Sequence, residues 1–233
     1  MTILIAAPIP QEYEALTDAL SAMGLNGVER DVGRLTAMQY DGGLLVAQGG
    51  LGKAQFAAQT QHIISHLEIE SPGELRALVC AGTCGRLDKS LSVGDVVVAT
   101  QTVEHDFNRG MALIKMPLPS FDGDAALIAK LREIATREDL PCNLHFGGVA
   151  SGDEGIASEK RIRELQESTG ALVVAWEGAG GARAAQLSGV PYLEIRAISD
   201  GAGEDAMQEF WSNIPIAMGS IAVVVRELAG WTE

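Results

Sequence analysis

The sequence predicts a single α/β domain with a mixed central β-sheet flanked by helices. Short apolar runs typical of strands alternate with amphipathic segments typical of helices along all 233 residues, and this alternation favours the α/β class. A glycine or an acidic residue follows nearly every expected strand, as at the ligand-binding edge of such sheets. No linker, internal repeat or low-complexity tract divides the chain, so we expect one domain over residues 1–233.

The first part of the chain predicts a strand, a helix and a hairpin. Residues 2–7 are a short apolar run, which is typical of a strand buried on both faces. Helical spacing of apolar residues predicts a helix over residues 12–23. The Asp41-Gly42 dipeptide is a strong hairpin signal and separates strands expected over residues 34–40 and 43–48.

The remaining elements alternate in the same way. Strands are expected over residues 75–80, 96–100, 145–150, 172–175 and 192–198, the first of them closed by a glycine-rich turn at 82–85. Helices are expected over residues 54–67, 124–138, 159–168, 178–188 and 208–229, the last interrupted at Pro215. Residues 107–122 carry two prolines and no clear period, so we expect a loop there, placed over the ligand site.

The composition excludes several classes of protein. A formal net charge of −14 would repel phosphate backbones, so we expect no nucleic-acid partner. Three cysteines without framework spacing indicate reduced thiols and a cytoplasmic protein. The chain shows no basic leader and no apolar run that could span a bilayer, so neither a signal peptide nor a membrane segment is expected. His62 and His66 have helical metal-pair spacing but no third ligand, so no metal site is expected.

Four places in the sequence combine residues that can carry chemistry. They are IPQEYEAL with Glu12, GGLGK with Lys53, AGTCG with Thr83, and the pair VVAWEG and RAISDG with Glu177 and Asp200. Each alone has a simpler structural explanation, as a first-turn helix acid, a loop-to-helix turn or a cap. GGLGK lacks both the full phosphate-loop pattern and GxGxxG spacing, so it is weak evidence for nucleotide phosphate binding.

Together and in this order, the segments resemble the purine nucleosidase and nucleoside phosphorylase superfamily. The chain is most similar to the methylthioadenosine/S-adenosylhomocysteine nucleosidase branch, over nearly its whole length. The most specific parts are VVAWEGAGGARAAQLSGVPYLEIRAISDGAG and the late FWSNI. The resemblance implies a nucleoside phosphorylase-like fold, a small nucleoside substrate and no cofactor. It also implies a homodimer in which residues 103–121 complete the neighbour's pocket.

The resemblance further implies a role for each site residue. Asp200 would protonate N7 of the departing purine and so make the base a neutral leaving group, for which its pKa must be raised by partial burial. Glu12 would activate the attacking water, Glu177 would bind the ribose hydroxyls, and Thr83 would orient Asp200 through its hydroxyl. The other implied substrate-binding positions are Trp176 under the sugar, Ile9, Leu51 and either Met207 or Phe210 around the 5′ substituent, and Ile156 and Ser199.

Some positions depart from the family pattern. Cys80 stands in the place of an arginine found in the related phosphorylases. The acid Glu12 stands where phosphate would lie and would repel it, which favours water as the nucleophile. Ala175 replaces the first acid of the usual VEMEA motif. Gly155 stands where an aromatic residue usually stacks on adenine, so the base pocket is expected to be remodelled, or filled by Phe107 or Phe121.

We therefore expect hydrolysis of the N-glycosidic bond of a 5′-substituted adenine nucleoside, with release of free base and sugar. A futalosine-type nucleosidase is an alternative favoured by the WEG and FWSNIP features, although that branch tends to carry asparagine in place of Asp200. A phosphate-dependent phosphorylase and a non-catalytic nucleoside-binding protein are two others. The joint presence of Glu12, Glu177 and Asp200 argues against a mere binder, which needs no acid and base.

Overall fold

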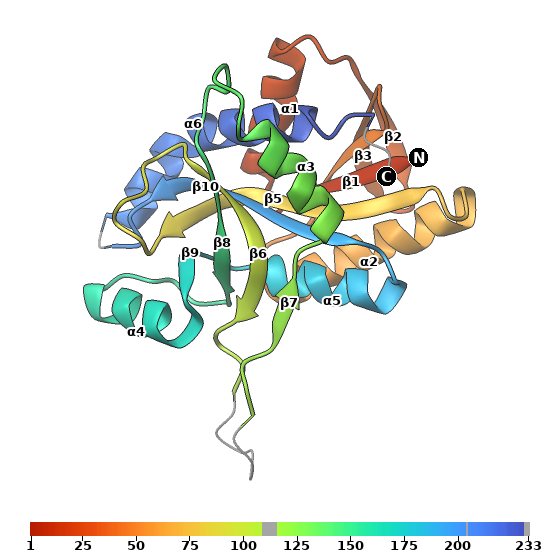
Figure 1. Cartoon of the computed structure of the whole chain (residues 1–233). Coiled ribbons are helices and arrows are strands. Elements are labelled where there is room, and N and C mark those ends of the chain that lie inside the picture. Colours follow the sequence, from red (N-terminus) through yellow and green to blue (C-terminus); the bar gives the residue numbers. More distant parts are fainter. Residues whose placement is uncertain (109–115, 204, 231–233) are drawn as a thin grey trace.

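A computed structural model describes residues 1–108, 116–203 and 205–230 of the chain. In this part, ten strands form one mixed sheet and six helices surround it (Figure 1). The strands are β1 (Thr2–Ala7), β2 (Gly27–Val32), β3 (Leu35–Tyr40), β4 (Leu44–Gln48), β5 (Leu75–Arg86), β6 (Val96–Glu104), β7 (Ser120–Asp122), β8 (Leu144–Ser151), β9 (Ala171–Ala175) and β10 (Tyr192–Asp200). The helices are α1 (Pro10–Ala22), α2 (Gly52–Glu70), α3 (Ala125–Ile134), α4 (Glu159–Thr169), α5 (Gly178–Ser188) and α6 (Ala206–Arg226). The predicted α/β class and mixed sheet are confirmed.

The sheet closes on itself at one end. Strands β10, β6, β8, β9 and β5 pair in this order, and β5 pairs back with β10. From β5 the sheet continues through β1, β4, β3 and β2. Strands β1, β4, β5 and β10 run parallel, so their carboxyl ends meet at one edge. That edge is where a ligand site is expected in such folds.

Helices cover both faces of the sheet because the central strands are apolar on both sides. In β1, Ile3 and Ile5 pack into a cluster with α1, α3 and α6. The alternate residues Leu4 and Ala6 pack into a second cluster with α2 and α5. This period of two is the pattern of a strand buried between two helical layers.

Two strands differ from the expected boundaries. Strand β5 does not end at Cys80 but continues through the AGTCG segment to Arg86. The glycines of this segment do not form a turn but let side chains of β10 approach the β5 backbone closely. A Cβ on Gly82 would lie 2.9 Å from Arg196 Nη1, and one on Gly85 would lie 2.9 Å from Asp200 Oδ1. Strand β10 likewise continues to Asp200, so this acid is the last residue of the strand.

Other elements were missed or placed wrongly. Strand β2 was not predicted, and β7 lies inside the segment 107–122 that was expected to be a loop. Residues 109–115 of that segment lie outside the described residues. Helix α6 runs through Pro215 without interruption. Pro215 costs about 3 kcal/mol in a helix, but its neighbours Ile214 and Ala217 are buried with the rest of one apolar face, and that burial outweighs the cost.

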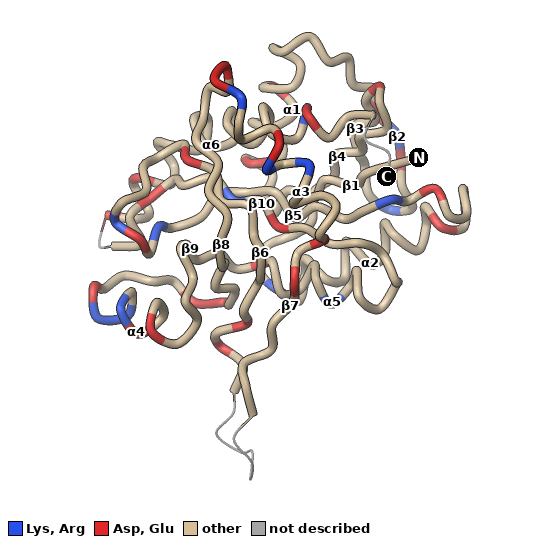
Figure 2. Tube along the Cα trace, in the orientation of Figure 1, with Lys and Arg blue, Asp and Glu red and all other residues tan. Residues whose placement is uncertain are grey.

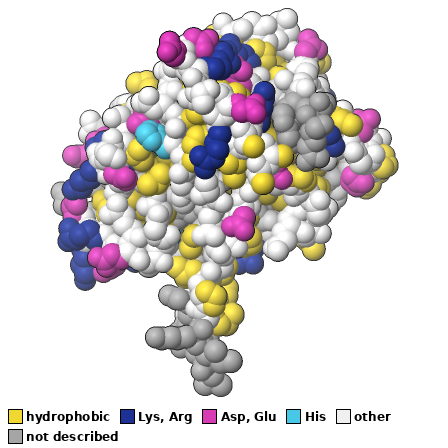
Figure 3. All heavy atoms as spheres, in the orientation of Figure 1, with side chains coloured by type: hydrophobic (Ala, Val, Ile, Leu, Met, Phe, Trp, Pro, Cys, Tyr) yellow, Lys and Arg dark blue, Asp and Glu magenta, His cyan; other side chains and the backbone are white. Residues whose placement is uncertain are grey.

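The surface carries the acidic excess of the chain. Asp and Glu are spread along the whole trace (Figure 2). On the face shown in Figure 3, basic side chains lie beside acidic ones rather than in one field. None of the helices in the described ranges has the length and apolar character needed to cross a membrane.

Helix α5 consists largely of small residues because it packs closely against α2 and β10. A Cβ on Gly180 would overlap the backbone oxygen of Lys53. We expect Gly180→Ala to lower the free energy of unfolding by roughly 1–3 kcal/mol, because the backbone of α2 must move. Urea denaturation of the variant measures this change.

Gly219 in α6 is the matched control. A Cβ there meets nothing within 4 Å, so Gly219→Ala should raise stability by about 0.5–1 kcal/mol through helix propensity. Equal stability of Gly180→Ala and the unmodified chain would contradict the packing argument.

Candidate active site

A cavity of about 800 Å³ lies at the edge where β1, β5 and β10 end. Three acidic residues predicted for the site, Glu12, Glu177 and Asp200, line it. All three are buried. They come from α1, from the junction of β9 and α5, and from β10, so the fold brings together residues that are far apart in the sequence.

Glu12 lies in the first turn of α1 with its carboxylate fully engaged. Its Oε1 accepts hydrogen bonds from the backbone N–H (2.7 Å) and the hydroxyl (2.6 Å) of Thr83, and its Oε2 accepts one from the Ile9 N–H (3.3 Å). Burial and the nearby charge of Glu177 raise the pKa of Glu12, while the Thr83 hydrogen bonds lower it. A buried carboxyl with a raised pKa is suited to general base catalysis near neutral pH.

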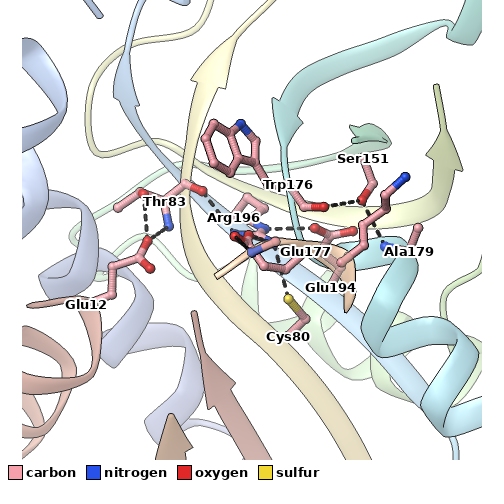
Figure 4. Close-up of polar contacts among 12 residues, drawn as sticks. Glu12, Cys80, Thr83, Ser151, Trp176, Glu177, Ala179, Glu194 and Arg196 are labelled. Atoms are coloured by element: carbon pink, nitrogen blue, oxygen red, sulfur yellow. Dashed lines mark hydrogen bonds and ion pairs between the residues drawn. The ribbon is translucent and has the colours of Figure 1, made fainter. Parts of the chain in front are cut away.

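The predicted role of Thr83 is wrong. Its hydroxyl donates to Glu12 rather than to Asp200 (Figure 4). The strand register explains this difference, because Thr83 is opposite Ala197 while Asp200 is opposite Gly85, two residues further along β5. Thr83 therefore positions the candidate base and not the candidate acid.

Asp200 is held by its own neighbours. The Ser199 hydroxyl donates to Oδ2 (2.8 Å) and the Ala202 N–H donates to Oδ1 (2.9 Å). Ala202 adopts a left-handed conformation with φ of 50°, which is uncommon for a residue other than glycine. Burial raises the pKa of Asp200, the two hydrogen bonds oppose this, and the charge of Glu209 raises it further. The raised pKa makes Asp200 easier to protonate than an exposed aspartate, as a general acid requires.

Ser199 was expected among the residues that contact substrate. Its side chain is fully buried and lies outside the cavity wall, where it bonds Asp200 and the Cys84 carbonyl. Its hydroxyl therefore contacts the Asp200 carboxyl group rather than the cavity, which differs from the predicted side-chain contact with substrate. Ser199 therefore positions the Asp200 carboxyl group through a hydrogen bond.

Arg196 is a site residue that sequence reasoning missed. Its guanidinium is buried and donates from Nε to Glu194 Oε1 (2.8 Å) and from Nη2 to Glu177 Oε2 (3.1 Å). Glu194 is buried as well and accepts a hydrogen bond from the Thr102 hydroxyl. The sequence signal that could have revealed this pair is Glu194-Ile195-Arg196. It places two opposite charges two residues apart, and so on the same face, of a strand expected to be buried.

The same guanidinium reaches across to β5. Its Nη1 donates to the Thr83 carbonyl (3.2 Å) and its Nη2 lies 3.2 Å from Cys80 Sγ (Figure 4). Among the described residues that line the cavity, Arg196 is the only basic one. Its donors are thus already directed at protein acceptors.

Glu177 is positioned by the turn between β9 and α5. The Ser151 hydroxyl donates to the Trp176 carbonyl (3.0 Å) and accepts from the Ala179 N–H (2.9 Å), which fixes this turn (Figure 4). The Gly52 N–H donates to Glu177 Oε1 (3.2 Å). The GGLGK segment therefore contributes a backbone donor near the site.

Lys53 of the same segment does not line the cavity. Its ammonium pairs with Glu104 at 2.9 Å and with Asp106. Hydrogen bonds to these two carboxylates raise its pKa despite the opposing effect of burial. The lysine is therefore a structural ion-pair partner. This agrees with the sequence, in which GGLGK lacks the full pattern of a phosphate-binding loop.

An apolar wall completes the cavity. The predicted Ile9, Leu51, Ile156, Trp176, Met207 and Phe210 all line it, and so does Trp211, which was not predicted. Leu51, Met207 and Trp211 are 53%, 69% and 51% exposed, which places them at the rim. Both Met207 and Phe210 line the cavity, so either can contact a ligand.

Neither aromatic named for the place of Gly155 lies in the cavity of its own chain. Phe107 and Phe121 are not part of the cavity wall, and the ring of Phe121 lies under the Arg183 guanidinium instead. A Cβ on Gly155 would meet nothing within 4 Å, so the space beside it is open. Among the described residues of one chain, the aromatic side chains that line the cavity are those of Trp176, Phe210 and Trp211.

Comparison with known proteins gives the family. The model of the phosphorylase superfamily matches residues 2–229. The 5′-methylthioadenosine/S-adenosylhomocysteine nucleosidase of Treponema pallidum is 30% identical, over 88% of this chain and 83% of the relative. The aminodeoxyfutalosine nucleosidase of Helicobacter pylori strain J99 is 28% identical, over 84% and 86%.

A solved structure agrees with these relatives. The 5′-methylthioadenosine/S-adenosylhomocysteine nucleosidase of Neisseria meningitidis in complex with methylthio-immucillin-A has a TM-score of 0.81 and 28% identity, over 98% of each chain. The resemblance drawn from the sequence motifs is thereby confirmed. The extent of the family match, together with the shared fold, shows that the chain belongs to the phosphorylase superfamily.

Proposed function

We propose that this chain hydrolyses the N-glycosidic bond of a 5′-substituted adenine nucleoside of the methylthioadenosine/S-adenosylhomocysteine type, releasing adenine and the free sugar. The observation that carries the proposal is the convergence of Glu12, Glu177 and Asp200 on one cavity. Glu12 and Asp200 both have raised pKa values because they are buried. The relatives named above support the substrate class.

Asp200 acts as the general acid. Cleavage of the bond between C1′ and N9 leaves the electron pair on the base, and a proton delivered by Asp200 to N7 makes the departing adenine neutral. The raised pKa of Asp200, caused first by burial, keeps that proton available. Ser199 and Ala202 fix both oxygens of the carboxyl group.

Glu12 and Glu177 act on the sugar side of the bond. Glu12 takes a proton from the attacking water, which adds to C1′ as the base leaves. Glu177 binds the ribose hydroxyls, and its charge stabilises the positive charge that develops on the sugar. Arg196 holds Glu177 in place through a hydrogen bond of 3.1 Å. After the reaction Glu12 carries one extra proton and Asp200 has lost one. The site returns to its starting state when Glu12 releases its proton and Asp200 takes one up from solvent.

Water suits this site better than phosphate. A phosphate nucleophile needs cationic side chains or unpaired backbone donors. Arg196 is the only basic residue among the described lining residues, and its donors are already directed at Glu177, Glu194 and Thr83. A phosphate at the sugar would also face Glu12 and Glu177. These contacts favour hydrolysis over phosphorolysis.

The apolar rim favours an apolar 5′ substituent. With the base at Asp200 and the ribose at Glu177, the 5′ group extends toward Leu51, Met207 and Trp211. An alkylthio group buries apolar surface against these side chains. The Helicobacter pylori relative makes an aminodeoxyfutalosine-type substrate the second candidate.

We also infer that the protein is a cytoplasmic homodimer, as the sequence resemblance implies. Leu51 and Phe107 are 53% and 38% exposed, and apolar side chains exposed in this way are suited to a subunit contact. The proposed contact includes residues 103–121 beside the partner's cavity.

A panel of nucleosides tests the proposed function. Methylthioadenosine, S-adenosylhomocysteine, aminodeoxyfutalosine and inosine are incubated with the chain, with and without phosphate, and the products are separated by chromatography. We expect free adenine and unphosphorylated sugar from the first two at rates that do not depend on phosphate. Release of base only when phosphate is present, or no release from any nucleoside, would refute the proposal.

Asp200→Asn removes the proton donor while it keeps the shape of the side chain. We expect kcat to fall by at least about 10²–10⁴-fold, because an amide cannot deliver the proton. Steady-state release of adenine measures the loss, and thermal unfolding checks that the fold is retained. A kcat close to that of the unmodified chain would remove Asp200 from the mechanism.

Glu12→Gln removes the proposed base. We expect at least an approximately 10²-fold loss of kcat with substrate binding retained. In the unmodified chain, kcat should fall as pH drops through the raised pKa of Glu12, because the base becomes protonated. It should also fall as pH rises through the raised pKa of Asp200, because the acid loses its proton. Normal turnover by the variant would assign the base to another residue.

The 6 position of the purine tests how Asp200 reads the base. Protonated Asp200 donates to N7, and its other oxygen accepts from a 6-amino group, whereas a 6-oxo group offers only a second acceptor. The unpaired buried acceptor costs roughly 1–3 kcal/mol, or about one to two decades in kcat/KM. A matched pair that differs only at this position should therefore favour the 6-amino member. Equal values would contradict the adenine assignment.

A further inference from the structure

Glu209 of helix α6 contacts the segment that follows the candidate acid. Its Oε2 accepts a hydrogen bond from the Gly201 N–H at 2.8 Å. Gly201 directly follows Asp200 and precedes Ala202, whose N–H donates to Asp200 Oδ1. The first turn of α6 is thus fastened to the backbone that carries and supports the acid.

Gly201 also lies close to two opposite charges. A Cβ there would be 3.5 Å from Glu209 Oε2 and 3.9 Å from both Nε and Nη2 of Arg86. Arg86 is fixed in turn, because its Nη1 donates to the Leu91 carbonyl at 2.9 Å. The backbone next to the acid therefore has both a carboxylate from α6 and a guanidinium from β5 close to it.

The titratable groups that face Asp200 come from two elements. Glu209 lies on α6, and Arg86 and Cys84 lie on β5. The negative charge of Glu209 raises the pKa of Asp200, and the positive charge of Arg86 lowers it. Cys84 is a buried thiol whose own pKa is raised by burial, so it stays neutral. Glu209 is the neighbour whose charge favours the protonated acid.

We propose that Glu209 is a positioning residue for the general acid, holding the 200–202 backbone through the Gly201 N–H and placing a negative charge beside Asp200. This inference rests on the proposed function. It goes further, because Met207, Phe210 and Trp211 of the same helix line the cavity. A ligand that contacts these side chains therefore contacts the element that fixes the acid.

Two variants separate the hydrogen bond from the charge. Glu209→Gln keeps an oxygen that can accept from Gly201 but removes the charge, whereas Glu209→Ala removes both. With Glu209→Gln, the alkaline limb of the kcat profile should move to lower pH by about half a unit, because the pKa of Asp200 falls. With Glu209→Ala, kcat should fall by a further factor of about 10 or more, because the acid is no longer held in place.

Asp205→Asn is the matched control. It removes the same charge from the N-terminus of the same helix, but Asp205 is exposed and its side chain makes no cap hydrogen bond. Its alkaline limb should coincide with that of the unmodified chain. Thermal unfolding of each variant checks the fold, and Glu209→Gln decides the question if Glu209→Ala is unstable.

An NMR titration makes the test independent of turnover. The Asp200 carboxyl is followed in chain labelled with ¹³C at aspartate, with Asp200→Asn identifying its signal. A lower pKa of Asp200 in Glu209→Gln than in the unmodified chain supports the proposal. An unchanged pKa together with an unchanged kcat profile overturns it. Failure of the unmodified chain to release any base would refute the proposed function instead, and would leave the titration result standing.

Discussion

The burial of one guanidinium among carboxylates is the constraint on which the site depends. Arg196 is almost inaccessible to solvent, and a buried charge is costly unless it is paired and hydrogen-bonded. The chain meets this requirement with Glu194 on the same strand, Glu177 at the start of α5 and the Thr83 carbonyl on β5. These contacts hold β10, β5 and the start of α5 in one arrangement. Glu177 is the proposed ligand of the ribose hydroxyls, and Thr83 positions the proposed base Glu12.

The small residues around this network follow from the same constraint. A side chain on Gly82 would press on Arg196 and Glu12, and one on Gly178 would overlap the Glu194 carboxylate. The glycines therefore serve close packing of charged groups against the backbone. Gly82 in β5 and Gly178 at the start of α5 are explained in this way. The requirements of the charged network thus explain features of the fold that propensity alone does not.

Local pattern predicted much of the fold, and the family resemblance implied the chemical residues, but neither gave all of the contacts between them. The apolar run of β1 and the Asp41-Gly42 hairpin were found because their signals lie within a few residues. The contact of Thr83 with Glu12 depends on the register of β5 against β10, which no local pattern encodes. Helix α6 continues through Pro215 because tertiary burial outweighs the cost of the proline. Arg196 was missed because its contacts with Glu177 and Thr83 join distant parts of the sequence, and its one local partner, Glu194, was not considered.

A crystal structure of this chain with methylthio-immucillin-A would test the central claim most directly. The claim is that the fold aligns Asp200 with the base, and that the charged network around Arg196 aligns Glu12 and Glu177 with the sugar. We predict that the base lies within hydrogen-bond distance of Asp200, the sugar-like hydroxyls contact Glu177, and the 5′ group lies near Met207. A base turned away from Asp200, or hydroxyls that do not reach Glu177, would contradict the account.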